Sequence, residues 1–158
     1  MTNLTKDGKA KDVDFMILAM DEAQRAADLG EVPIGAVAVV DGQVVARAHN
    51  LREATHDPLG HAELLLVQQL SKEGKRWRLS DVTIYVTCEP CLMCMGAMLQ
   101  ARIARIVYGC RDPKAGACGS LYDVSNDPRL NHNIQVTPDI LGVECGRLLS
   151  NFFRARRK

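Results

Sequence analysis

Four residues of this sequence have the types and the spacing that metal-assisted chemistry needs. His61 and Glu63 form an H-x-E pair, and Cys91 and Cys94 form a C-x-x-C pair directly after Pro90. Imidazole nitrogen and thiolate sulfur are donors that zinc prefers, and a catalytic zinc site uses three protein ligands and leaves a fourth position open. We therefore expect one Zn²⁺ per chain, held by the histidine and both cysteines, with Glu63 beside the open position as a proton carrier.

Helix starts should position both halves of this motif. The pair Asp57-Pro58 combines an N-cap residue with a first-turn proline, which predicts a helix over 58–72 that carries His61 in its early part. A second helix is expected over 91–101, directly after a strand over 82–87. Helix N-termini favour the thiolate form of cysteine, so two facing helix starts would present one imidazole and two thiolates to a single ion.

A lone C-x-x-C pair also fits a redox pair or half of a structural zinc site. A structural site needs a fourth protein ligand, and no second C-x-x-C or H-x3-H pair follows Cys94 in the sequence. Cys88 lies three residues before Cys91, but Pro90 separates strand from helix and should direct Cys88 elsewhere. His56 is about 140° from His61 around a helix, so the two do not share a face. The catalytic site is the favoured interpretation, because both halves of the motif occur together with the glutamate.

Length and composition indicate a single globular domain. The chain has 158 residues, of which 47% are hydrophobic, and it has no apolar run long enough for a membrane span. The first ten residues lack the apolar core of a signal peptide, so we expect a flexible leader over 1–10 and one domain over 11–158. These features predict a cytoplasmic protein without membrane attachment.

Charge and cysteine content narrow the class further. The 6 cysteines are expected to be reduced thiols, because no export signal is present and the motif uses two of them. The net charge of +1 does not by itself indicate a nucleic-acid binder. The positive charges gather at the C-terminal end, however, at Arg147, Arg154, Arg156, Arg157 and Lys158.

The pattern of apolar residues predicts an α/β domain with three layers, α/β/α. Helical spacing marks 13–29, a short turn near 121–124 and a last helix from 138, whereas strands are expected over 34–40, 43–48, 105–109 and 134–136 besides the one before the C-x-x-C helix. The pair Asp41-Gly42 between the first two strands predicts an antiparallel hairpin. Later strands are joined through helices and should be parallel, which gives a mixed five-stranded sheet.

The motifs resemble those of the cytidine deaminase superfamily, and most closely those of its bacterial tRNA adenosine deaminase family. The resemblance covers nearly the whole chain after the leader, and four stretches carry it: 31–36, 56–63, 110–121 and 149–157. The H-x-E and P-C-x-x-C halves match the signature of zinc nucleobase deaminases. Two departures are Gly60, where the family usually has alanine, and Cys88, where leucine is common; neither touches the expected chemistry.

This resemblance implies zinc-dependent hydrolysis of adenosine to inosine at the wobble position of a tRNA anticodon. It implies that Glu63 moves protons, that Asn50 holds the base, and that backbone groups of Ala62 and Cys91 line the pocket. A tRNA anticodon stem-loop would be the substrate, and the family resemblance implies a homodimer. An unpaired anticodon base suits such chemistry, because a stacked base cannot reach the active site.

Two further segments are candidates for RNA contacts. At the C-terminus, Phe152, Phe153, Arg154 and Arg156 combine rings with positive charge, although cations at a helix end also suit the helix dipole. Asp112 follows a strand end on the rim where Asn50 is expected. It either braces its own loop or accepts a hydrogen bond from a ribose 2′-hydroxyl, the group that distinguishes RNA from DNA.

Two rival functions remain open at this point. A deaminase of free guanine, cytosine or a nucleoside would have the same metal motif, but it would have no electrostatic need for the basic C-terminus. A non-catalytic RNA-binding module with a structural zinc belongs to another class, and Glu63 argues against it.

Overall fold

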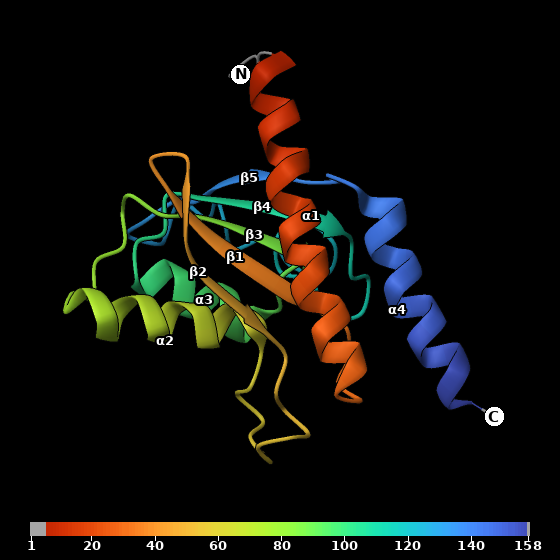
Figure 1. Ribbon diagram of the computed structural model, residues 1–158. Coiled ribbons are helices and arrows are strands. Elements are labelled where there is room, and N and C mark those ends of the chain that lie inside the picture. Colours follow the sequence, from red (N-terminus) through yellow and green to blue (C-terminus); the bar gives the residue numbers. More distant parts are fainter. Residues whose placement is uncertain (1–5, 158) are drawn as a thin grey trace.

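A mixed five-stranded sheet forms the middle layer of the protein (Figure 1). The computed structural model describes residues 6–157. Its strands run in the order β2-β1-β3-β4-β5, and β1 pairs antiparallel with both β2 and β3, whereas β3, β4 and β5 are parallel. The strand bounds are β1 Gly35–Val40, β2 Gln43–His49, β3 Thr83–Cys88, β4 Arg105–Cys110 and β5 Gln135–Thr137. The predicted five-stranded mixed sheet is confirmed.

Helices cover both faces of this sheet, as Figure 1 shows. Their bounds are α1 Lys6–Asp28, α2 Ala62–Gly74, α3 Leu92–Gln100 and α4 Gly142–Arg156. Leu66 of α2 and Met95 of α3 belong to the larger buried cluster, whereas Met16 of α1 and Cys145 of α4 belong to a second cluster on the opposite face. The predicted α/β/α architecture is therefore confirmed. Among the described residues, no helix combines the length and apolar character needed to cross a bilayer.

The first two strands form the predicted hairpin. Asp41 and Gly42 both have positive φ, 49° and 75°, which is the backbone conformation of the two-residue turn favoured by this pair. β1 is almost entirely buried, as a central strand covered on both faces must be. The helix α1 lies so close to β1 at Gly35 that a side chain there would overlap the helix backbone.

The first helix is longer than the sequence pattern predicts. It begins at Lys6, so residues 6–10 of the expected leader are helical, and residues 1–5 lie outside the described residues. The reason is Asp12, which is buried and accepts hydrogen bonds from Tyr85 at 2.7 Å and from both terminal nitrogens of Arg105. These bonds dock the first half of α1 on the sheet, and an acidic residue gave no sign of this burial.

The second helix begins four residues later than predicted. The Asp57 side chain accepts a hydrogen bond from the Leu59 amide at 2.9 Å, and its carbonyl accepts one from the Gly60 amide at 3.0 Å. The pair Asp57-Pro58 thus closes a turn and does not start a helix. His61, with φ −86° and ψ 144°, is the N-cap of α2. Cys91 is likewise the N-cap of α3, which begins one residue later than expected.

Two smaller predictions were wrong. Residues 121–124 form no helix; Asp123 pairs with Cys118 in an isolated bridge. The last helix was expected from 138 but begins at Gly142, after Leu141 in the left-handed conformation.

Candidate metal centre and the loops around it

The two helix N-termini bring one imidazole and two thiols together. His61 and Cys91 are the N-cap residues of α2 and α3, and Cys94 follows in the first turn of α3. The His61 Nδ1 atom lies 3.6 Å from the sulfur of Cys91 and 3.6 Å from that of Cys94. All three donor atoms lie within 4.8 Å of one another, close enough to hold one metal ion.

The separations among these donors fit a tetrahedral zinc ion. Zinc lies about 2.3 Å from thiolate sulfur and about 2.05 Å from imidazole nitrogen, so a tetrahedral angle places nitrogen and sulfur about 3.6 Å apart. Both nitrogen–sulfur distances of this site have that value. A donor set of one nitrogen and two sulfurs also suits zinc better than magnesium or calcium, which prefer oxygen.

The pKa values of the two thiols are shifted in opposite directions. A hydrogen bond from the Cys94 thiol, followed by the influence of His61, lowers the pKa of Cys91 to about 4. The same hydrogen bond to Cys91, together with burial, raises the pKa of Cys94. Metal binding would require both sulfurs to be deprotonated, because the thiolate is the form that binds metal.

Glu63 lies in the first turn of α2 and is 4% exposed. Burial is the main reason why its pKa is raised, to about 7, and the nearby Cys91 adds to the effect. A carboxyl group with a pKa near neutrality can both take and give a proton at physiological pH, which is what a general acid–base catalyst needs. The structure therefore places a group with proton-carrier properties beside the three donors.

Asn50 lies directly after β2, on the same rim as the metal centre. It is 6% exposed, and its side-chain oxygen accepts a hydrogen bond from the Ala62 amide at 2.9 Å. This bond connects the end of the hairpin to the first residue of α2, next to His61. The structure thus brings Asn50 and Ala62 together, and the carboxamide nitrogen of Asn50 is the end that a base could use.

The loop that carries Asp112 is braced from within. The Asp112 side chain accepts hydrogen bonds from the amides of Lys114 at 3.0 Å and Ala115 at 3.2 Å. The Asp112 amide in turn donates to Glu89 at 3.2 Å. These contacts favour the loop-brace role of Asp112, while its second carboxylate oxygen can still serve a ligand.

The C-terminal candidates lie at the end of α4. The Phe152 and Phe153 rings are 5.4 Å apart, edge to face, and the Arg156 guanidinium lies 4.4 Å from the centre of the Phe152 ring. Arg156 also donates a hydrogen bond to the carbonyl of Gly30, just after α1. The structure thus gives Arg156 partners within the chain, whereas Arg154 is an exposed side chain.

Contacts also link this end of α4 to the rim loop after Asn50. Glu31, which follows Gly30 and is 1% exposed, accepts hydrogen bonds from the amides of Glu53 at 3.2 Å and Ala54 at 2.5 Å. The end of α4, the end of α1 and the 51–57 loop therefore lie at one end of the molecule, as Figure 1 shows.

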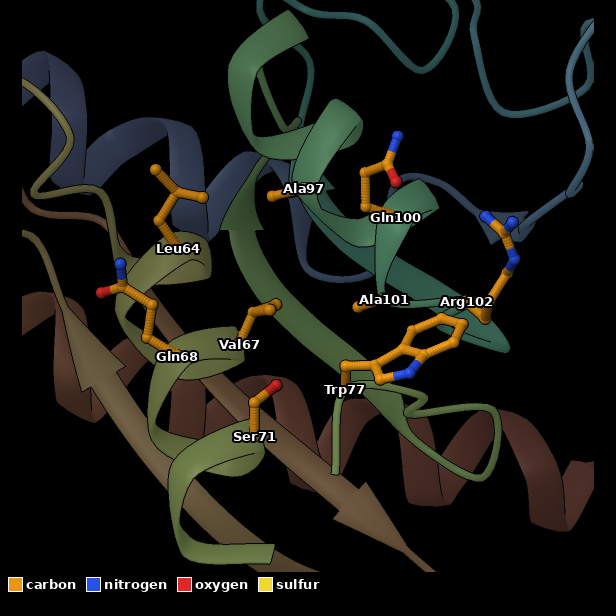
Figure 2. A pocket seen from close by; sticks show the side chains of 9 residues that line it. All are labelled: Leu64, Val67, Gln68, Ser71, Trp77, Ala97, Gln100, Ala101 and Arg102. Carbon is orange, nitrogen blue, oxygen red and sulfur yellow. The ribbon is translucent and has the colours of Figure 1, made fainter. Parts of the chain in front are cut away.

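A hollow of about 610 Å³ lies away from the metal centre, between α2 and α3 (Figure 2). Leu64 and Val67 of α2 face Ala97 and Gln100 of α3 across it, and Trp77 lies along its end. His61, Cys91 and Cys94 do not line this hollow, so we do not assign it as the reaction site.

Sequence reasoning missed the buried carboxylates that hold the rim loops, Glu31 and Glu89. Both are at most 3% exposed. Glu89 interrupts an otherwise apolar stretch between Cys88 and Pro90, and an acidic residue in such surroundings is a signal of burial with partners. Nothing in the sequence around Glu31 gives a comparable signal.

A histidine at a helix N-cap and two cysteines that could hold a metal ion, next to a buried glutamate, fit the site signature of the zinc nucleobase deaminases. A family model described as MafB19-like deaminase matches residues 10–157. The chain is 46% identical to the tRNA-specific adenosine deaminase of Bacillus subtilis, over 91% of this chain and 89% of that protein. The chain belongs to the MafB19-like deaminase family, in which it is similar to tRNA-specific adenosine deaminases over nearly its whole length.

Solved structures agree with this placement. A structure from a study of A-to-I editing by tRNA:A34 deaminases superposes with a TM-score of 0.81 at 39% identity, covering 86% of this chain and 99% of that one. A guanine deaminase from Nitrosomonas europaea superposes with a TM-score of 0.68 at 23% identity, covering 91% of this chain and 83% of that one, and shares the fold alone. The resemblance to bacterial tRNA adenosine deaminases that the motifs indicate is confirmed.

Proposed function

We propose that this protein converts adenosine to inosine at the wobble position of a tRNA anticodon by zinc-dependent hydrolysis. The observation that carries the chemistry is the pair of 3.6 Å distances from His61 Nδ1 to the sulfurs of Cys91 and Cys94. The substrate is supported by the relative at 46% identity that is named tRNA-specific adenosine deaminase. It is further supported by the rings and positive charges at the end of α4, where Phe152, Phe153 and Arg156 lie together and Arg154 is exposed.

His61, Cys91 and Cys94 would hold the zinc ion. A bound zinc ion supplies Lewis-acid activation that makes water a nucleophile at neutral pH. Glu63 takes a proton from the attacking water and delivers it to N1 of adenine as the water oxygen bonds to C6. A second proton passes to the exocyclic amino group, the C6–N bond breaks, ammonia leaves and inosine remains.

The protein would also orient the base and exclude water from it. Asn50 already binds the Ala62 amide through its oxygen, at 2.9 Å, so its nitrogen would donate to the base. The backbone groups of Ala62 and Cys91 would line the pocket on either side. An adenosine in an anticodon loop is unpaired, which makes its extrusion into such a site inexpensive.

The direct test incubates the zinc-loaded protein with total tRNA, an anticodon stem-loop, free adenosine and free guanine or cytosine. Inosine is measured in digested RNA and ammonia in solution. The proposal predicts inosine in the stem-loop and none from free bases. Ammonia from guanine or cytosine without inosine in RNA would establish the rival deaminase, and RNA binding without any ammonia would establish the non-catalytic module.

We propose further that the protein acts as a homodimer, as the family resemblance implies. Large apolar side chains that are half exposed support an interface, among them Leu92 at 50%, Leu121 at 52% and Tyr122 at 52%. Light scattering should give twice the mass of one chain, and a single-chain mass at micromolar concentration would contradict this. A cytoplasmic location follows from a tRNA substrate and remains part of the proposal.

A further inference from the structure

One buried carboxylate next to the metal centre has no part in the mechanism above. Glu89 lies between the end of β3 and Cys91, and it is 3% exposed. Burying an ionised carboxylate is costly unless hydrogen bonds replace the water that it loses. The partners of Glu89 therefore show what its burial achieves.

All of its hydrogen-bond donors belong to the loop that follows β4. Its Oε1 atom accepts from the Asp112 amide at 3.2 Å, and its Oε2 atom accepts from the amides of Cys118 and Ser120, each at 3.1 Å. The Ser120 hydroxyl donates to Oε1 as well. Hydrogen bonds to an ionised acceptor are about twice as strong as neutral ones, so four of them fix the course of the 112–120 loop.

The same loop is pressed against the start of α3. The Ala117 amide donates to the Pro90 carbonyl at 2.8 Å, and Gly116 pairs with Cys91 in an isolated bridge. A side chain at Gly116 would overlap the Glu89 carboxylate. The short segment from Glu89 to Cys91 thus supplies a metal-ligand candidate and also anchors the loop that carries Asp112.

We propose that Glu89 is a positioning residue of the deamination. Its carboxylate holds the 112–120 loop, and with it Asp112, at a fixed place relative to the N-terminus of α3. The RNA-facing loop and the metal centre therefore keep one relative position while the base is bound. This inference rests on the proposed function, since it assigns the loop to the RNA substrate.

The principal variant is Glu89→Gln. This change replaces one acceptor oxygen by an NH₂ group, which would face amide donors and repel them. The 112–120 loop should therefore shift, while α3 stays in place. We expect kcat/KM on an anticodon stem-loop to fall about 10-fold or more, since a displacement of about 1 Å can cost about 100-fold. The loss should lie mainly in KM, and the zinc content should remain one per chain.

A matched control separates positioning from stability. Asp12→Asn alters another buried carboxylate with several donors, Tyr85 and Arg105, at the amino end of β4 and away from the site. This variant should lower the melting temperature and leave KM unchanged. If Glu89→Gln also lowers only the melting temperature and leaves KM at the wild-type value, Glu89 is a structural residue and the proposal is overturned.

Two further variants keep the test decisive if Glu89→Gln fails to fold, and Ser120→Ala is the milder of them. Ser120→Ala removes one donor at an exposed position, and Gly116→Ala pushes the loop away from the carboxylate. Both should raise KM without loss of zinc. When either is combined with Glu89→Gln, the effects should be less than additive, because all three variants disturb one contact; strict additivity would contradict a shared cause.

Amide hydrogen exchange gives a readout that does not depend on activity. The amides of Asp112, Cys118 and Ser120 should exchange slowly in the wild type and rapidly in Glu89→Gln, while the amides of α3 remain protected. Unchanged exchange at these three amides would refute the anchoring role. A wild-type protein that makes no inosine would instead refute the proposed function, and the exchange result would still decide whether Glu89 holds the loop.

Discussion

Glu63 is the residue on which the proposed chemistry depends most directly. Its burial raises its pKa to about 7, and it lies in the first turn of α2, close to the donors without being one of them. Glu63→Ala should therefore retain zinc and lose about 100-fold or more in deamination rate, the usual range for general acid–base catalysis. The rate is measured on the stem-loop and the metal by elemental analysis.

The contrasting variants are Cys94→Ala and His61→Ala, which remove donor atoms. They should lose both metal and activity. A fully active Glu63→Ala protein would disprove the assigned proton transfer, and full zinc occupancy in Cys94→Ala would show that the metal is held by other residues.

Asp112 has two roles to distinguish, the loop brace and the recognition of a ribose hydroxyl. The Asp112→Asn side chain keeps the acceptor oxygen that binds the Lys114 and Ala115 amides, so the brace should survive. It removes a negative charge that repels any nucleic acid. If Asp112 also accepts from a 2′-hydroxyl, the variant should narrow the preference for RNA over DNA, mostly through better activity on DNA.

The measurement is kcat/KM on an RNA stem-loop and on a DNA copy of it. The decisive quantity is the ratio of these two values. The same ratio in the wild type and in Asp112→Asn would leave the loop brace as the only role.

At the level of elements, the arginines at the end of α4 differ in whether they have contacts within the chain. Arg156 contacts Gly30 and the Phe152 ring, whereas Arg154 and Arg157 are exposed beyond them. The double variant Arg154→Gln/Arg157→Gln should weaken stem-loop binding. The plot of log binding constant against log salt concentration should also become less steep, by about 0.7 to 0.9 for each phosphate that the variant no longer neutralises.

Arg156→Gln is the matched control for that experiment. It should loosen the end of α4 from α1 and lower the melting temperature, with little change in the salt slope. If the double variant leaves the slope unchanged, the positive charges serve the helix end alone.

The elements themselves were largely predictable from the sequence, while several of their starts were not. Apolar runs and helical spacing predicted every strand and every helix of the structure. The start of α2 was misplaced because Asp57-Pro58 has the composition of a helix start, and only the bonds from Leu59 and Gly60 show that it closes a turn. Histidine is an unusual N-cap residue, so nothing in the sequence marked His61 as the true start.

The candidate site was predictable where residue types carry their own chemistry. The donor residues of the H-x-E and C-x-x-C pairs can be named from the sequence alone. Asp12 and Glu31 cannot, because their importance lies in which distant amides and cations they meet, with partners up to 93 positions away along the chain. The apolar surroundings of Glu89 indicate burial, but they do not identify its partners in the 112–120 loop. Such contacts depend on topology, which local patterns do not encode.

At the scale of the whole molecule, the metal centre depends on the fold more than the fold depends on the metal. The helices that carry the donors are anchored by apolar residues of the larger core cluster, including Leu66, Leu70, Met95 and Met98. We therefore expect a chelator to abolish activity while the far-UV circular dichroism stays unchanged, and zinc to restore activity. Loss of the helical signal on chelation would instead show that the protein needs the metal to fold, as zinc fingers do.

The placement of two donors at N-cap positions has a consequence for the balance between stability and activity. Neither His61 nor Cys91 makes a side-chain capping hydrogen bond to its helix. Serine, threonine, aspartate and asparagine at that position typically stabilise a helix by about 1 kcal/mol over residues that do not cap. Both α2 and α3 thus have, at the N-cap, a residue that could bind metal and that does not cap the helix.

The stability lost at an N-cap that does not cap its helix can be measured in the metal-free protein. Cys91→Ser should be inactive yet more stable than chelator-treated wild type, by about 1 kcal/mol, because serine caps α3. Cys94→Ser makes the same chemical change inside the helix, where no cap is gained, and should bring no such increase. Equal melting temperatures for Cys91→Ser and the chelated wild type would mean that the cap position carries no stability penalty here.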